Sequence, residues 1–349
     1  MNIYLDRGFY KIYPNLYVII IADSGKLRKS TAVEYGVDQL LRHVPGVKLF
    51  VERMTMEGLL DQMDQVTFSN GIVQRSGEVF VFAPELIMFL PGDEISKKVI
   101  GFLTSVYMGK EKYGYLTKGG GEVKLENVLI TFLGATAPDW LETISEDAAK
   151  GGFLARIVFI TAEKRKKAIA WPQPNATSAR LEDLRDDLIG ISNLRGQMIP
   201  TQAFKDTFEK WYIKEDPPHD DPRVQGFRER EHDLVIRVAM LLSIAASNSL
   251  VVDVEHLQNA RTIVKDVEDF VPKALSHIAT SPHARDAERV LGQIKRRGGT
   301  MSHTDMARAN SWKLSKTELE EIVRTLENRA EIHMVRQGRA MIYKLGPKP

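Results

Sequence analysis

The chain has 349 residues, of which 43% are hydrophobic and 27% are charged, as in an ordinary globular protein. This length allows one large domain or about two to three smaller ones, each able to bury a core. The chain has no cysteine, which excludes disulfides and thiolate metal sites. Because no apolar run approaches the ~18 residues of a membrane span and no signal-peptide pattern is present, the sequence predicts a cytoplasmic protein without a membrane segment.

The net charge of +2 hides an asymmetry along the chain. From residue 284 to the end there are 14 Lys and Arg against 8 Asp and Glu, so this tail carries +6 and the remainder −4. A basic end on a nearly neutral body indicates contact with a polyanion such as nucleic acid.

The stretch 16–36 carries the strongest chemical signal. An unbroken apolar run, Leu16 to Ala22, predicts a strand buried on both faces, and after a polar turn Lys29 opens a helical pattern. This order is typical of a nucleotide-phosphate site, because a helix N-terminus attracts anions while a lysine and a hydroxyl can reach phosphate and magnesium. The predicted nucleotide-binding residues are Ser24, Gly25, Arg28, Lys29, Ser30 and Thr31. The aromatic segment before the strand is expected to pack beside this site, and a packed terminal segment without a role in binding is the alternative.

The loop departs from the usual G-x-x-x-x-G-K-[ST] motif. Counted back from Lys29, its glycines would fall at Asp23 and Arg28, whereas the loop contains only Gly25. A basic strand-to-helix turn that binds no ligand is therefore the alternative.

The pattern that does fit is Ser-Gly-x-x-Arg-Lys-Ser-Thr over 24–31. It resembles the loop of phage, prophage and plasmid P-loop ATPases related to AAA+ replicative helicases. The resemblance implies ATP and Mg²⁺ as cofactors, with Lys29 in catalysis and Ser30 as the metal ligand.

A second predicted strand of the core ends in a single acid. The run from Val79 to Phe82 is followed by Ala83, Pro84 and Glu85, so the aspartate that usually holds the magnesium shell is missing. The related ATPases likewise end this strand in a lone Glu followed by an apolar residue. The resemblance therefore implies that Glu85 activates the attacking water, and an exposed glutamate before a helix is the alternative.

The next strand and the hairpin before it suggest two further roles. Residues 113–127 read as a hairpin with Lys118 at its glycine-rich tip, and the strand 128–133 leads into Thr136. In helicase-type AAA+ proteins such a hairpin contacts DNA in the pore, and a polar residue past this strand senses the γ-phosphate. The resemblance implies those roles for Lys118 and Thr136; for Lys118 a solvated turn is the alternative.

Arg156 lies between a Gly-Gly-Phe sequence and the apolar strand 157–160. AAA+ rings carry an arginine finger at this position, which reaches the nucleotide of the neighbouring subunit. The resemblance implies this catalytic role for Arg156. A local ion pair with Glu146 or Asp147 is the alternative.

Five strands alternating with helices between residues 16 and 161 predict a doubly wound α/β fold with a mainly parallel sheet. We expect a P-loop ATPase core over 1–172 and, by resemblance, an AAA+ helical lid over 173–280. The lid arginines that could reach nucleotide are Arg228, Arg230 and Arg237, although an ordinary salt bridge is the alternative for each.

The tail, 281–349, has three helical segments followed by two alternating segments, which is the order of a winged helix. Ser315 and Glu318 predict a capping box at the third helix. The candidate DNA-binding residues of this tail are Lys313, Lys316, Arg336 and Arg339. A winged helix used for protein contact is the alternative.

These features together favour an ATP-driven, ring-forming DNA helicase or translocase of a mobile element. The resemblance implies a homo-oligomer, a hexamer in this family, with single-stranded DNA in the pore and duplex DNA at the winged helix. One alternative is an initiator or regulator that holds nucleotide with little turnover. Another is an ATPase of a phage-related defence or packaging system.

Overall fold

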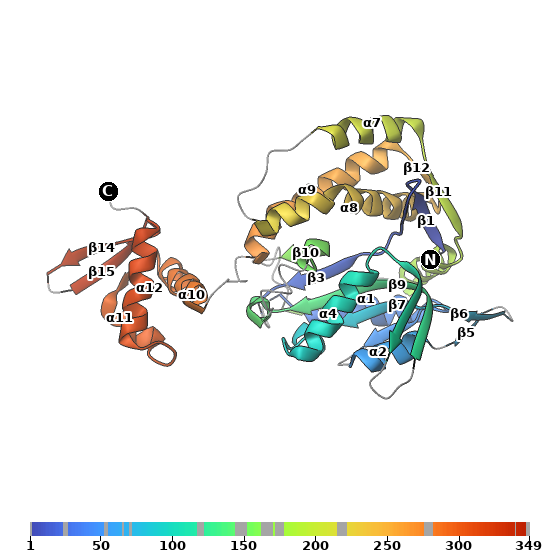
Figure 1. The fold of residues 1–349 in the computed structure, drawn as a ribbon. Coiled ribbons are helices and arrows are strands. Elements are labelled where there is room, and N and C mark those ends of the chain that lie inside the picture. The colour runs from blue at the N-terminus through green and yellow to red at the C-terminus, as the bar shows by residue number, and fades with distance from the viewer. Residues whose placement is uncertain are drawn as a thin grey trace. The chain divides into compact units, whose positions relative to one another are not determined.

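The computed structural model describes residues 2–23, 27–51, 55–64, 66–69, 72–116, 122–143, 152–161, 170–171, 178–214, 222–275, 282–338 and 340–346. The chain forms two compact units, Met1–Ala274 and Leu275–Pro349 (Figure 1). Among the helices of the described ranges, not one combines the length and the apolar character that crossing a bilayer requires.

A parallel sheet forms the centre of the first unit, and it confirms the predicted α/β class. Its strand order is β10-β3-β9-β7-β4, with every neighbouring pair parallel. The strands are β3 (Tyr17–Ile21), β4 (Leu49–Val51), β7 (Glu78–Ala83), β9 (Glu122–Thr136) and β10 (Ile157–Thr161). The long β9 also pairs antiparallel with β8 (Lys110–Leu116), so the predicted hairpin and the core strand after it share one continuous strand. A separate antiparallel hairpin is formed by β5 (Val66–Ser69) and β6 (Ile72–Arg75).

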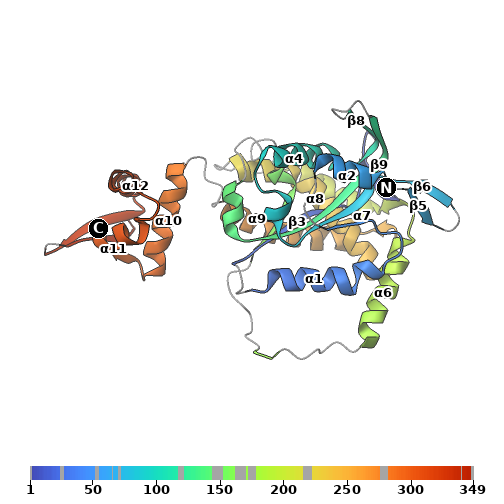
Figure 2. The ribbon, with the colours of Figure 1, turned by 90° about the horizontal axis from the view of Figure 1, so that it is seen from below.

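Helices cover both faces of this sheet (Figure 2). On one face α1 (Lys29–Gln39) packs Val33 and Val37 against Phe82 and Ala135. The other face carries α2 (Met56–Met63), α3 (Leu86–Phe89) and α4 (Glu94–Val106), and there the hydroxyl of Tyr17 donates to the Leu103 carbonyl. Short 3₁₀ turns are η1 (Leu41–His43), η2 (Pro138–Thr143) and η3 (Leu154–Arg156).

The remainder of the first unit is helical with a small sheet of its own. Its helices are α6 (Ser178–Ser192), α7 (Gln202–Ile213), α8 (Pro222–Ser247) and α9 (Val254–Leu275). The sheet has the order β12-β11-β1-β2, from β1 (Ile3–Asp6), β2 (Lys11–Ile12), β11 (Gly196–Pro200) and β12 (Val251–Val252). The N-terminal segment thus joins the helical block, where Arg7 packs over the Phe208 ring of α7 at 4.8 Å, instead of lying beside the predicted nucleotide site.

A fully buried arginine ties the helical block to the central sheet. Arg237 of α8 is 0% exposed and donates to the carbonyl of Tyr13 at 2.6 Å and to the side chain of Asn15, just before β3. Its guanidinium also packs over the Tyr107 ring at 4.4 Å. These contacts offset part of the cost of burying the cation, although among the described residues its Nε has no hydrogen-bond partner. Arg237 is therefore a structural residue.

The second unit contains three helices and a three-stranded antiparallel sheet. The elements are α10 (Pro282–Arg296), β13 (Thr300–Ser302), α11 (His303–Asn310), α12 (Lys316–Asn328), β14 (Ile332–Gln337) and β15 (Ala340–Leu345), with the sheet order β13-β15-β14. The predicted capping box of Ser315 and Glu318 is confirmed at the start of α12. The core of the second unit is made by apolar residues from all three helices and the sheet.

Candidate nucleotide-binding site

The carboxyl ends of β3, β9 and β7 lie side by side. Ile21, the last residue of β3, is opposite Thr136, the last residue of β9, and Ala83 of β7 is opposite Gly134. Just past β3, the amide of Ala22 donates to the Thr136 carbonyl at 3.1 Å. This is the edge where open α/β sheets place their ligands.

The helix that follows β3 brings the two predicted catalytic segments into contact. Ser30, in the first turn of α1, donates a hydrogen bond from its hydroxyl to Oε1 of Glu85 at 3.3 Å, across 55 positions of sequence. Glu85 lies immediately past β7, as predicted, and its side chain is exposed. The hydroxyl and the carboxylate therefore face the same space at the sheet edge.

Thr136 is buried at this edge, with 3% of its surface exposed. Its hydroxyl donates to the Ala137 carbonyl at 3.2 Å. Its strand end lies beside Ala22, the residue that follows β3. The predicted loop residues Ser24 and Gly25 lie outside the described residues.

Arg28 adopts a left-handed backbone conformation, with φ 51° and ψ 39°, and it is the N-cap of α1. The usual motif has glycine at this position, and glycine is the residue that enters this region without steric cost. Among the described residues α1 has no side-chain cap and no acid in its first turn, so the helix start presents Arg28, Lys29 and unpaired amides. Such a helix start attracts an anion.

Replacing Arg28 separates its backbone strain from its charge. Arg28→Gly is expected to be more stable than Arg28→Ala by about 1 kcal/mol, because both lack the guanidinium and only glycine relieves the strained backbone. In thermal unfolding the glycine variant should have a midpoint about 2 °C higher. As a control, Lys98, exposed on α4, should show the opposite order, because glycine destabilises a helix interior. Equal midpoints for the two Arg28 variants would contradict a left-handed residue here.

The oxygens at this edge suit magnesium. Mg²⁺ in phosphate sites takes one or two protein oxygens together with phosphate and water, and Ser30 and Glu85 supply a hydroxyl and a carboxylate 3.3 Å apart. In the described part of the chain no group of three or more His, Cys, Asp or Glu side chains could hold a metal ion on protein ligands alone. The residues present thus fit a metal that arrives with nucleotide.

Arg156 lies at the other end of the strands, beside the amino-terminal end of β3. It directly precedes β10, whose first residue, Ile157, is opposite Tyr17, the first residue of β3. The length of β3, roughly 15 Å, therefore separates Arg156 from the phosphate edge of its own chain. Arg156 is out of reach of the nucleotide that its own α1 would hold.

Three arginines gather around Tyr107 near this edge. The guanidiniums of Arg156 and Arg237 pack over the Tyr107 ring at 5.8 Å and 4.4 Å, and a Cβ added to Gly152 would lie 2.9 Å from Arg156 and 3.8 Å from Arg230. Burial, and after it the positive charge of Arg230, lowers the pKa of Arg156 from its usual value. Arg156 donates to the Gly152 carbonyl at 2.5 Å, while its buried Nε has no hydrogen-bond partner in the part of the chain that the structure describes. Asp233 is the acid that lines the same small pocket.

Among the described residues, Arg156 and Arg230 make no ion pair with a carboxylate, and Glu146 and Asp147 lie outside the described residues. The closeness of Arg230 to Arg156 is a feature that sequence spacing does not reveal, because 74 positions separate them.

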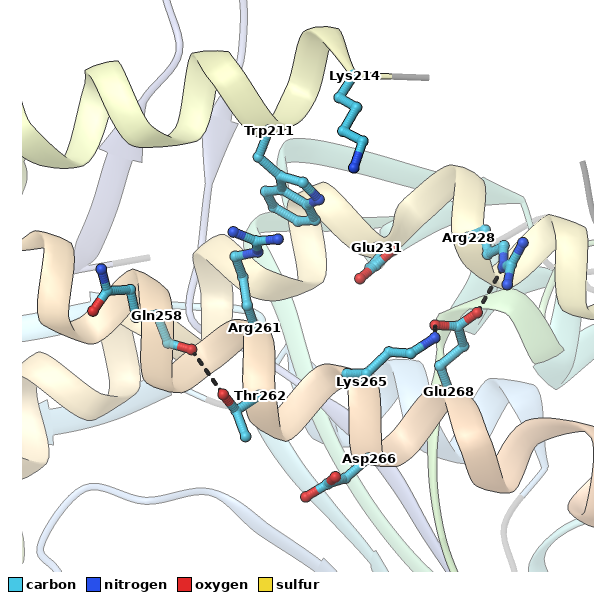
Figure 3. A pocket seen from close by; sticks show the side chains of 10 residues that line it. All are labelled: Trp211, Lys214, Arg228, Glu231, Gln258, Arg261, Thr262, Lys265, Asp266 and Glu268. Atoms are coloured by element: carbon cyan, nitrogen blue, oxygen red, sulfur yellow. Dashed lines mark hydrogen bonds and ion pairs between the residues drawn. The ribbon is translucent and has the colours of Figure 1, made fainter. Parts of the chain in front are cut away.

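The third lid arginine, Arg228, forms a structural ion pair with Glu268 at 2.6 Å, and Lys265 pairs with the same carboxylate at 2.6 Å. These residues line a pocket of about 590 Å³ between α7, α8 and α9 (Figure 3). There Arg261 packs over the Trp211 ring at 4.7 Å. This pocket belongs to the helical block, and its cations and acids largely compensate each other.

The candidate DNA-binding residues of the second unit are distributed over a turn, a helix start and a hairpin. Lys313 pairs with Asp286 at 3.2 Å, and Lys316 lies 3.8 Å from Glu320 with 85% of its side chain exposed. Arg336 is exposed on β14. Arg339 and, in the first unit, Lys118 lie outside the described residues.

No protein-family model matches the chain, and no curated protein matches it. Among solved structures, the apo C-terminal region of NrS-1 is similar at 11% identity with a TM-score of 0.24, over 96% of this chain and 67% of that chain. The A form of the same apo region has 12% identity and a TM-score of 0.26, over 95% and 66%. Cdc6p from Pyrobaculum aerophilum has 9% identity and a TM-score of 0.23, over 96% and 86%. Likenesses of this extent carry no argument, so the assignment of function rests on the site itself.

Proposed function

We propose that the chain is a ring-forming, ATP-hydrolysing motor of the AAA+ type that moves on nucleic acid. The contact between Ser30 and Glu85 supports this most directly, because it joins the start of α1 to the end of β7 at the edge that Thr136 also occupies. The start of α1, the carboxylate of Glu85 and the end of β9 at Thr136 therefore lie together at the carboxyl ends of the strands.

In this proposal the start of α1 binds the phosphates. Lys29 places a point charge at the outer phosphates, Arg28 adds a second cation, and Ser30 holds Mg²⁺. The metal neutralises charge on the phosphate oxygens during transfer. Glu85 orients and polarises the attacking water, and Thr136 contacts the γ-phosphate.

Arg156 acts in the neighbouring subunit. Its place at the far edge of its own sheet excludes it from its own nucleotide, and its proximity to Arg230 without a paired carboxylate suits the approach of an anion. Each site is then completed by a second copy of the chain, and hydrolysis requires assembly. Six copies in a ring is the expected state.

The second unit would act as a winged helix that binds nucleic acid through its basic residues. Lys313 and Lys316 lie at the start of α12, and Arg336 lies on β14. Arg339 and Lys118 are included by their place in the sequence, and Lys118 would contact the strand in the pore. Phage or plasmid replication is the biological setting that the loop pattern favours.

One observation favours a second function, an initiator or regulator with little turnover. Between the end of β7 and Glu85 stands Pro84, and Ala83 closes the strand, so no second carboxylate supports the metal there. A defence-system ATPase would use the same chemistry.

ATP binding tests the site before any turnover is considered. Lys29→Ala is expected to weaken ATP binding at least about tenfold, since it removes the point charge at the outer phosphates. Binding of a fluorescent ATP analogue with Mg²⁺ measures this, and Lys98→Ala on α4 is the matched control. Unchanged affinity in Lys29→Ala would overturn the phosphate site.

A further inference from the structure

Trp312 is an exposed aromatic side chain that the second unit leaves out of its core. It lies in the turn between α11 and α12, and 74% of its surface is exposed. Burying an aromatic side chain contributes roughly 1.5–3 kcal/mol, so a ligand that covered this ring would gain free energy of that order.

The ring is exposed but held in place. Its Nε1–H donates to the Ala309 carbonyl at 3.2 Å, and the guanidinium of Arg289 on α10 packs against the ring with its Cζ 5.3 Å from the centroid. Arg289 is held by Asp286 at 3.0 Å, and Lys313 pairs with the same carboxylate at 3.2 Å. Two elements thus fix the orientation of a flat surface that remains accessible to solvent.

The surroundings of the ring are basic. From Arg308 to Lys316 the chain carries three cations and no acid, within a unit of net charge +6. The acids nearby are Asp286, which is already paired with two cations, and Glu318 and Glu320 in the first turns of α12. A negatively charged partner is therefore favoured over a neutral or basic one.

A fixed aromatic ring beside cations is the combination that binds single-stranded nucleic acid, in which bases stack on the ring and phosphates meet the cations. In a duplex the bases are stacked on each other and their faces are unavailable. We propose that Trp312 stacks on an unpaired base, so that this turn binds single-stranded nucleic acid. The proposal rests on the proposed nucleic-acid function and is independent of ATP hydrolysis.

Fluorescence anisotropy with the full chain, without nucleotide, tests this assignment. Trp312→Ala is expected to weaken binding of a labelled oligothymidine about tenfold, as the loss of one stacked base does, and Trp312→Phe should restore most of the affinity. The salt dependence should not change, because no phosphate contact is removed. Trp171→Ala, which removes another exposed tryptophan, in the first unit, is the matched control and should bind as the wild type.

Two oligonucleotide controls separate stacking from other effects. A duplex of the same length should bind Trp312→Ala and the wild type equally, and an abasic oligonucleotide should remove the difference between them. Wild-type affinity of Trp312→Ala for the single strand overturns the stacking role, and so does an equal loss on duplex and abasic strands. A changed oligomeric state with unchanged binding assigns Trp312 to a protein contact instead. Failure of the wild type to bind any nucleic acid counts against the proposed function itself.

Discussion

Glu85→Gln is expected to bind ATP with wild-type affinity and to lose hydrolysis by a factor of about one hundred or more. The carboxylate stands at the end of β7, 3.3 Å from the Ser30 hydroxyl, where a water that attacks the γ-phosphate would have to be held. An amide of the same shape keeps the packing and the contact but cannot polarise or deprotonate that water, and general-base catalysis contributes about 10²–10⁴ in rate. Phosphate release with excess ATP and single-stranded DNA measures the loss.

The matched control is Glu57→Gln, which neutralises an exposed glutamate in the first turn of α2 and should hydrolyse ATP as the wild type does. Wild-type turnover in Glu85→Gln would show that another group activates the water. Absence of turnover in the wild type, with ATP binding intact, favours the initiator or regulator that holds nucleotide.

The central sheet, and the place where Ser30 meets Glu85, are predictable from local sequence patterns. The apolar runs of β3, β7 and β10 form the predicted strands, and a helix follows each of them along the chain. Parallel strands then bring their carboxyl ends to one edge whatever the details of packing. This is why Ser30 and Glu85 meet in the structure although the sequence separates them widely.

Features that depend on non-local pairing are not predictable in this way. The segment 173–280, expected to be a helical lid, also contains the strands β11 and β12. β11 pairs with β1, which is far away in the sequence, with Ile3 opposite Gly196. Such short strands have too few residues to show a period, and only the partner strand stabilises them. The burial of Arg237 and the approach of Arg230 to Arg156 also follow from tertiary packing, since an arginine on a helix usually remains in solvent.

Arg156→Ala is expected to reduce hydrolysis about a thousandfold while ATP binding to the isolated chain stays unchanged. The rate falls because the finger offsets charge that develops in the transition state. ATP binding is unchanged because Arg156 precedes β10 and lies at the amino-terminal ends of the strands, away from the ATP site of its own chain. Phosphate release and binding of the ATP analogue, measured on the same preparation, give the two values.

Mixing the two inactive variants tests whether Arg156 acts across an interface. In a mixed assembly the Arg156→Ala chain supplies an intact Glu85, and a neighbouring Glu85→Gln chain supplies an intact Arg156. This arrangement occurs at about one quarter of the interfaces when equal amounts of the two chains assemble at random. Activity should therefore reappear on mixing, although neither variant hydrolyses ATP alone. The substitution Arg156→Ala also removes contacts with Tyr107 and Gly152, which could cause the chain to misfold. Recovered activity excludes misfolding, because in the mixed assembly the Arg156→Ala chain supplies the working ATP site. Mixtures that stay inactive while both variants still assemble would place Arg156 in a structural role beside Tyr107.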